Sequence, residues 1–488
     1  MKKIWVSLGI WAVLSGTALF SQQEKFRKSA PPPEPLQELK LPPIESAPLS
    51  NKLNISFVFR DSVPFMSLEI VIFAGEALSP DKIPGTATFV GGMLGRGTQS
   101  RTAANIEEIV ESIGGTFSVS TNQDYVLVSF HFFPEYLDQA LDLISQMLLQ
   151  PNFTKSEIDY VKFATTYDLL GRERNLEFVA NRHLFRLLFK NHPYEKFAFS
   201  SDVIKNWNLN ALLDFFDRYY RPNNAHLIIT GNLNLNTVTR KVSHYLNTWQ
   251  PRELPPMPLQ TVKPPDKDRL CLIDVPQAKD CVIYFGTAFP SPGTQDRFAL
   301  MVLNQVLGGT PASRLFMNLR ESKEFAYNAL SEIDFFNAGS AFCVQARVTP
   351  EFIAPSIREI QKEIKALTTS PISSQEIEQA KSYLIYHFPV EIERLDAFSE
   401  KVADIKARSG GDECWNKYYE QVMLVNGERV FGAAQKYLLQ PFIVVVAGDK
   451  SVLSERLLEF DSFDVFDSKG QFQYLVNKDK KGAAHEAR

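Results

Sequence analysis

Residues 85–93 read GTATFVGGM, and this stretch decides how the chain is interpreted. The apolar segment before it, Phe65 to Gly75, is typical of a strand, so residues 85–93 are expected to form the helix that follows. Thr88 offers only a weak metal ligand, and Gly91 and Gly92 have no side chain. The stretch therefore keeps the frame of a strand and helix without groups that hold a metal or transfer a proton.

Motifs downstream of this stretch follow one another in a defined order. They are Gly97-Thr98, an amphipathic helix from Thr102, the turn Ile113-Gly114-Gly115, the alternating strand pair Thr116 to Phe133, Gln150-Pro151-Asn152-Phe153, His192-Pro193-Tyr194 and Tyr219 to Asn224. Together they resemble the pitrilysin or insulinase-like (M16) family of zinc peptidases. In that family the segment matching residues 85–93 reads roughly G-x-A-H-F-x-E-H-M.

The resemblance implies where a zinc site would lie in this chain. The first ligand falls on Thr88, the catalytic glutamate on Gly91 and the second ligand on Gly92, while the third ligand, a glutamate, falls near Asp168. A catalytic zinc needs imidazole or carboxylate ligands and a carboxylate base, so Asp168 alone cannot hold one. The alternative for Asp168 is a solvated helix residue.

Other metal sites find no support in the spacing of histidines and cysteines. The seven histidines are all more than five residues apart, and the four cysteines form no Cys-x-x-Cys pair. We therefore expect no cofactor in this chain.

Composition sets broad limits on the class of protein. The chain has 488 residues with 44% hydrophobic content, enough for two or more domains with substantial cores. Its net charge of -4 gives no electrostatic reason to expect nucleic acid.

The N-terminus indicates export. Two lysines precede the apolar run Ile4 to Phe20, so residues 1–22 are predicted to be a signal peptide, and an uncleaved membrane anchor is the alternative. Residues 23–48 are proline-rich and are expected to form a linker. We expect a periplasmic protein, with membrane association left open.

The rest of the chain repeats itself. Pro134-Glu135-Tyr136 is echoed 216 residues later by Pro350-Glu351-Phe352, and the strand-like segment His226 to Gly231 is echoed by Ile443 to Gly448. Echoes at nearly one offset indicate a tandem duplication.

The periodicity switches between helical and strand patterns within each half. We predict an α+β fold of two homologous domains, each a mainly antiparallel sheet with helices packed on it, as the resemblance also implies. The predicted boundaries are a first domain at 49–253, a proline-rich linker at 254–266, a second domain at 267–460 and a partly disordered tail at 461–488.

The second domain keeps a motif of the family. Arg320 and Tyr327 lie seven residues apart in the context LRESKEFAY, and the resemblance implies that they bind substrate and stabilise developing charge. Guanidinium and phenol groups donate hydrogen bonds to a carbonyl or an oxyanion. The alternative is a solvated Arg320 and a half-buried Tyr327, and for Arg314 a structural role is expected.

Two functional hypotheses follow. The first is the non-catalytic subunit of a heteromeric M16 peptidase, inactive alone, which lends Arg320 and Tyr327 to a homologous partner with an intact H-x-x-E-H motif. Zinc is then expected in that partner, and the substrate is a peptide or an unfolded protein. The second is a peptide-binding or scaffolding protein without a peptidase partner.

Overall fold

The computed structural model describes residues 40–256, 260–408, 411–478 and 485–486. The predicted signal peptide and residues 23–39 of the predicted linker lie outside these ranges. No helix in the described part of the chain is long and apolar enough to span a bilayer.

The first half forms a six-stranded sheet in the order β1-β2-β6-β3-β5-β4. Its strands are β1 (Glu45–Pro48), β2 (Asn54–Phe59), β3 (Met66–Ile72), β4 (Thr116–Thr121), β5 (Val126–Phe132) and β6 (Ala225–Gly231). Its helices are α1 (Thr86–Met93), α2 (Ala103–Ser112), α3 (Leu137–Leu149), α4 (Lys155–Arg172), α5 (Leu176–Leu188), α6 (Leu209–Tyr219) and α7 (Leu235–Leu246).

The second half forms a sheet in the order β14-β13-β12-β7-β11-β8-β10-β9. Its strands are β7 (Arg269–Asp274), β8 (Cys281–Phe289), β9 (Ala326–Phe335), β10 (Ser340–Val348), β11 (Ile443–Gly448), β12 (Ser462–Asp467), β13 (Phe472–Asn477) and β14 (His485–Glu486). Its helices are α8 (Thr294–Leu307), η6 (Phe316–Ser322), α9 (Ile353–Thr369), α10 (Ser374–Glu391), α11 (Leu395–Ala407), α12 (Gly411–Asn416), α13 (Tyr418–Met423), α14 (Gly427–Leu438) and α15 (Lys450–Leu457).

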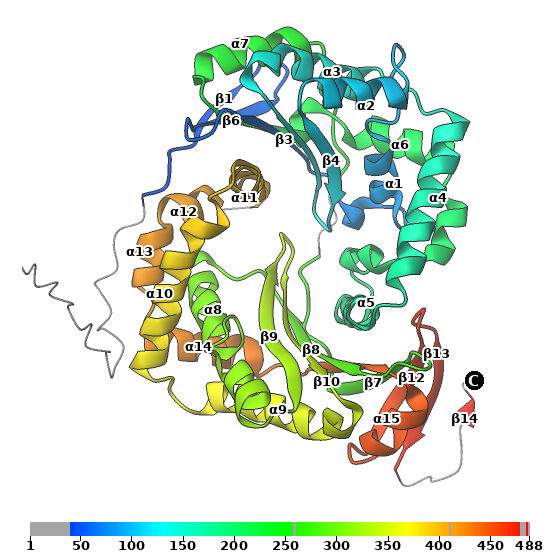
Figure 1. Cartoon of the computed structure of the whole chain (residues 1–488), viewed down its shortest axis with the longest axis vertical. Coiled ribbons are helices and arrows are strands. Elements are labelled where there is room, and N and C mark those ends of the chain that lie inside the picture. The colour runs from blue at the N-terminus through cyan, green and yellow to red at the C-terminus, as the bar shows by residue number, and fades with distance from the viewer. Residues whose placement is uncertain (1–39, 257–259, 409–410, 479–484, 487–488) are drawn as a thin grey trace, which may run out of the picture. The chain divides into compact units, whose positions relative to one another are not determined.

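The two halves share one topology. The order β2-β6-β3-β5-β4 in the first sheet matches β7-β11-β8-β10-β9 in the second, and in each the first pair is parallel and the other three are antiparallel. Figure 1 shows the two sheets with their helices. The predicted α+β architecture of two similar domains is thus confirmed.

Two predictions about connecting segments are wrong. Residues 461–478, expected to be part of a disordered tail, contain β12 and β13, and β12 pairs in parallel with β7. Residues 45–48, expected to belong to the linker, form β1 and pair with β2. In both cases a partner strand elsewhere in the chain supplies the backbone hydrogen bonds that the local sequence does not reveal.

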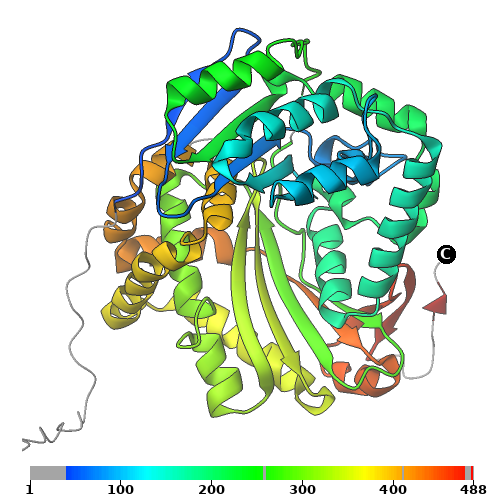
Figure 2. The ribbon, with the colours of Figure 1, turned by 45° about the horizontal axis from the view of Figure 1, so that its top comes forward.

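A helix from each half packs on the sheet of the other half. Helix α5 contacts β8 and β11 of the second sheet, and α11 contacts β3 and β6 of the first. Figures 1 and 2 both show the teal helix α5 next to the strands of the second sheet. The apolar side of α5, with Val179, Ala180 and Leu184, joins one buried cluster with Cys271, Ile273 and other residues of the second sheet.

The face of the first sheet beneath α11 is unusually polar. Leu68 and Ile70 on β3 belong to the core on the other face, so the alternating Ser67 and Glu69 point toward α11. Glu69 is fully buried and accepts a hydrogen bond from the Ser67 hydroxyl at 2.7 Å. Burial raises the pKa of Glu69 to about 8, so its carboxyl is mainly protonated at neutral pH.

Candidate functional site

Thr88, at the position of the first zinc ligand, is bonded to a buried carboxylate. Glu76, in the turn before α1, accepts hydrogen bonds from the Thr88 hydroxyl at 2.5 Å and the Thr88 amide at 2.7 Å. It also accepts from the Gly85 amide and from the hydroxyl of Ser79, whose oxygen in turn receives the Ala87 amide. Glu76 therefore caps the free amide groups at the start of α1.

The two glycines at the other motif positions lie against neighbouring side chains. A Cβ atom at Gly91 would stand 3.1 Å from the Thr121 Oγ1 atom and 3.3 Å from a methyl carbon of Val119. One at Gly92 would stand 3.1 Å from a methyl carbon of Val161. A side chain at either glycine would therefore require these neighbours to move by a few tenths of an ångström.

Asp168 lies on α4 and shares a cavity with Thr88. This cavity has a volume of about 420 Å³, and Asp334 and Phe336 of the second half also line it. The Asp168 side chain is largely exposed, and its carboxylate lies 3.6 Å from the guanidinium of Arg172. The fold thus brings the predicted first and third ligand positions to one cavity.

These residues do not fit a zinc ion. The Thr88 hydroxyl donates to Glu76, the glycines offer no donor atoms, and Asp168 is paired with Arg172. Across the described ranges, no group of three histidine, cysteine or acidic residues is arranged to hold a metal. The cavity has instead an aromatic lining that includes Phe178, Phe185 and Phe199.

Sequence reasoning missed two acidic residues here. Glu76 gave no signal because its partners lie 3 to 12 positions along the chain in a turn that only the fold closes. Asp334 lies near the end of β9, and burial raises its pKa to about 6 with a further contribution from Glu332. Asp334 lines the same cavity as Thr88 only because the two halves of the chain pack against each other.

Arg320 and Tyr327 lie at the other end of β9 from Asp334. Arg320 belongs to η6, a π-helical turn, and Tyr327 is the second residue of β9. The chain turns between these two residues. The Phe325 amide donates a hydrogen bond to the Leu319 carbonyl, and Glu324 adopts a left-handed conformation with φ of 57°.

Both side chains of the pair are open to solvent. Tyr327 is 56% exposed and Arg320 is also exposed. Among the described residues that line the 420 Å³ cavity, neither of the two appears. The pair is therefore exposed and lies outside the lining of the cavity at Thr88.

Arg314 has a structural environment. Its guanidinium donates to both carboxylate oxygens of Glu376, at 2.6 and 3.0 Å. Glu376 also completes the capping box of α10 with Ser373. Chiefly through the hydrogen bond from Arg314, the pKa of Glu376 falls to about 2, which matches the structural role expected for Arg314.

Two family models match the chain in succession. Residues 58–200 match the insulinase family, peptidase family M16, and residues 206–384 match the peptidase M16 inactive domain. Together the two models span about two thirds of the 488 residues. The chain belongs to peptidase family M16 and is a homologue of its inactive type.

Relatives and solved structures agree with this membership. The chain is 22% identical to the non-peptidase homolog YmxG of Helicobacter pylori, with 71% of this chain and 81% of that protein covered. It is 21% identical to the uncharacterized zinc protease YmxG of Bacillus subtilis, with 81% and 96% covered.

The fold is also that of solved structures. A protease from Helicobacter pylori is similar with a TM-score of 0.78 at 20% identity, covering 84% of this chain and all of that one. A peptidase M16 inactive domain from Pseudomonas fluorescens is similar with a TM-score of 0.74 at 19% identity, covering 83% and 98%.

Proposed function

We propose that this chain is the non-catalytic subunit of a heteromeric M16 peptidase. The observation that carries the proposal is a contrast between the two halves. In the first, Thr88 is bonded to Glu76 and the other two motif positions are glycines, whereas in the second Arg320 and Tyr327 stand exposed at the family spacing. A chain with no metal ligands of its own and an outward Arg/Tyr pair suits a site completed by a second chain.

In this proposal the partner is a homologous M16 chain with an intact H-x-x-E-H motif, which holds the zinc. Arg320 and Tyr327 contact the substrate peptide bound between the two chains. The guanidinium fork and the phenol hydroxyl donate hydrogen bonds to a peptide carbonyl as negative charge develops on its oxygen. The name non-peptidase homolog, given to the relative from Helicobacter pylori, supports a chain that is inactive alone.

The apolar run near the N-terminus supports an exported, periplasmic complex, with membrane association left open. N-terminal sequencing of the native protein tests this part. A mature chain starting after about residue 22 is expected of a processed export substrate.

The test is turnover of a quenched peptide by this chain, by a zinc-bearing homologue and by their mixture. We expect hydrolysis only in the mixture. Arg320→Ala should lower the turnover of the mixture by about 100 to 1,000-fold, and Tyr327→Phe by a smaller factor, because each variant removes a donor to the developing charge. Complex formation should be unchanged on size-exclusion chromatography.

The matched control is Arg358→Ala, an exposed arginine on α9 whose side chain pairs with Glu459. It should leave turnover unchanged. Full activity in both Arg320 and Tyr327 variants would reject the assigned roles. A complex that forms without ever gaining hydrolysis would favour the scaffold hypothesis instead.

A further inference from the structure

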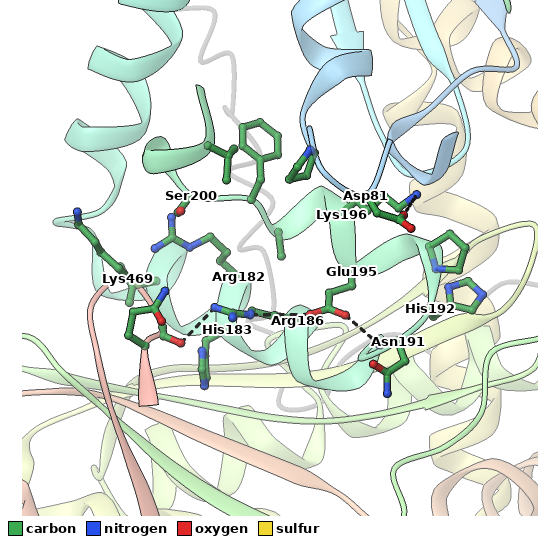
Figure 3. Close-up of a pocket in the computed structure, with 18 of the residues that line it drawn as sticks. Asp81, Arg182, His183, Arg186, Asn191, His192, Glu195, Lys196, Ser200 and Lys469 are labelled. Carbon is green, nitrogen blue, oxygen red and sulfur yellow. Dashed lines mark hydrogen bonds and ion pairs between the residues drawn. The ribbon is translucent and has the colours of Figure 1, made fainter. Parts of the chain in front are cut away.

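A cavity with a volume of about 690 Å³ lies beside α5. Its walls come from α5, from η3 (Pro193–Ala198) and from the turn Ser468–Gln471 between β12 and β13. It shares Arg182 and Phe199 with the cavity next to Thr88, so the two are neighbours. Figure 3 shows the charged side chains that gather around it.

His183, on α5, is a buried polar residue of this cavity without a partner. Its side chain packs on Phe466 and is 3% exposed. Within the described residues neither ring nitrogen has a hydrogen-bond partner. An unpartnered buried polar group costs about 1–3 kcal/mol, so this ring is a strained feature next to the cavity that calls for an explanation.

Burial, helped by nearby arginines, keeps this histidine neutral. Burial, with smaller contributions from Arg186, Arg269 and Arg182, lowers the pKa of His183 to about 3. At neutral pH the ring therefore presents one N–H donor and one acceptor nitrogen. The same positive surroundings that disfavour the imidazolium favour an anion beside it.

Arg186 has unused donors in the same cavity. Its Nη1 donates to the Gly470 carbonyl at 3.1 Å, the one hydrogen bond it makes within the described residues. The Glu195 carboxylate is 3.9 Å from its Nε, beyond hydrogen-bond distance, and accepts instead from the Asn191 amide at 2.9 Å. The Arg186 side chain is 40% exposed, so its remaining donors are accessible to a ligand.

Most charges on the cavity wall are paired. Arg182 pairs with Glu173, Lys469 with Asp202 and Lys196 with Asp81, each within 3.0 Å. Among the described residues that line the cavity, Arg186 is the cation whose nearest carboxylate, that of Glu195, is as far as 3.9 Å away. An anionic ligand would therefore pair with Arg186.

The volume of the cavity and its apolar lining indicate what kind of molecule carries the anionic group. A volume of this order suits a small organic molecule or the end of a peptide rather than a lone inorganic ion. Val179, Val203, Phe199 and Ile273 give apolar surface next to the basic groups.

We propose that this cavity binds an oxyanion, a carboxylate or a phosphate, carried on a partly apolar body and held by hydrogen bonds from Arg186 next to the buried ring of His183. The guanidinium fork offers the two parallel donors that both kinds of oxyanion accept. The proposal does not depend on the subunit role, because it involves neither the zinc position nor Arg320 and Tyr327.

Titration calorimetry on the full chain at low ionic strength tests the proposal. The probes are inorganic phosphate, a short apolar peptide with a free C-terminal carboxylate, and the same peptide with a C-terminal amide. We expect one saturable site per chain for phosphate or for the free-acid peptide and none for the amide. Phosphate alone, or the free acid alone, would identify which oxyanion the site takes.

Arg186→Gln should weaken binding by about ten- to a hundredfold, because a hydrogen bond to a charged group is lost. Arg218→Gln is the matched control, since this arginine on α6 is similarly exposed and pairs with Asp214 away from the cavity. It should bind as the native chain does.

A second readout follows His183 itself without mutation. The ¹⁵N resonances of its ring should shift on addition of the bound probe, because an anion next to the ring changes its electrostatic surroundings. The proposal is overturned if no probe saturates a site, if Arg186→Gln binds as tightly as the native chain, or if the His183 resonances do not move.

Discussion

At the scale of single residues, the zinc position is shaped by what surrounds it as much as by the absence of ligands. Glu76 uses both carboxylate oxygens to hold Thr88, Ser79 and the amides at the start of α1. Val119, Thr121 and Val161 occupy the space beside Gly91 and Gly92. Thr88 is therefore tied to Glu76 at the edge of the 420 Å³ cavity, and side chains crowd the two glycines.

A second buried carboxyl, Glu69, gives a prediction about pH. Its folded pKa of about 8 lies above its value in the unfolded chain, so the folded state binds the extra proton between these two values. The contribution of Glu69 to the free energy of unfolding is therefore complete below the unfolded pKa. It falls as the pH rises toward 8, by up to about 1.4 kcal/mol per pH unit.

Glu69→Gln removes this titration, so the variant should gain stability relative to the native chain as pH rises from about 5 to 8. Urea unfolding at several pH values measures the difference. His131 on β5 and Asp396 and Glu400 on α11 also act on this carboxyl, and they stay unchanged in the variant. Glu108→Gln at an exposed site on α2 is the control, and a pH-independent difference for Glu69→Gln would contradict the prediction.

At the scale of elements, β12 shows how a segment that looks like a tail becomes part of a core. Phe463, Val465 and Phe466 are buried, and Arg269 of β7 pairs with Asp464 at 2.5 Å. The strand lies in parallel with β7, almost 200 residues earlier. Without it, β7 would present an unpaired apolar edge.

Truncation after residue 460 should therefore destabilise the protein by on the order of 5 kcal/mol, because three large apolar side chains lose their burial. That loss approaches the whole stability of many domains, so we expect poor soluble yield or a strongly lowered melting temperature. Circular dichroism on heating measures it. Truncation after residue 478 is the control and should melt close to the full chain; equal melting of both truncations would refute the role of β12.

At the scale of the whole molecule, the exchange of α5 and α11 makes the two similar halves interdependent. Leu184 of α5 lies against Gly286 of β8, where a Cβ would come within 2.9 Å of it. Tyr125 of the first half donates to Asp404 of α11 at 3.0 Å, and Arg408 holds the same carboxylate. Each half therefore carries an apolar or polar surface that only the other half covers.

Fragments 49–253 and 254–478, produced separately, should be insoluble or aggregated, because α5 would expose its apolar side. Produced together, they should co-purify as a folded pair. Leu184→Asp should prevent that association, while Lys190→Asp at an exposed site should not. A well-folded monomeric 49–253 fragment would show that the exchange is not required.

Much of this protein could be read from its sequence because it depends on side-chain identity and near neighbours. The segments predicted as a strand before residue 85 and as a helix from Thr102 fold as β3 and α2, and the echoed segments ending at Gly231 and Gly448 form the matching strands β6 and β11. The lack of ligands at Thr88, Gly91 and Gly92 needs no structure at all.

Tertiary structure alone decided the rest, because it depends on contacts between residues far apart in the chain. No local pattern places α5 on the second sheet, pairs β12 with β7, or brings Asp334 to the cavity that Thr88 lines. The same holds for His183, which reads as an ordinary helix residue until the turn at Gly470 and the strands beneath it bury both of its ring nitrogens. Burial and hydrogen-bond satisfaction are properties of the packed chain, and the sequence specifies them only through the fold.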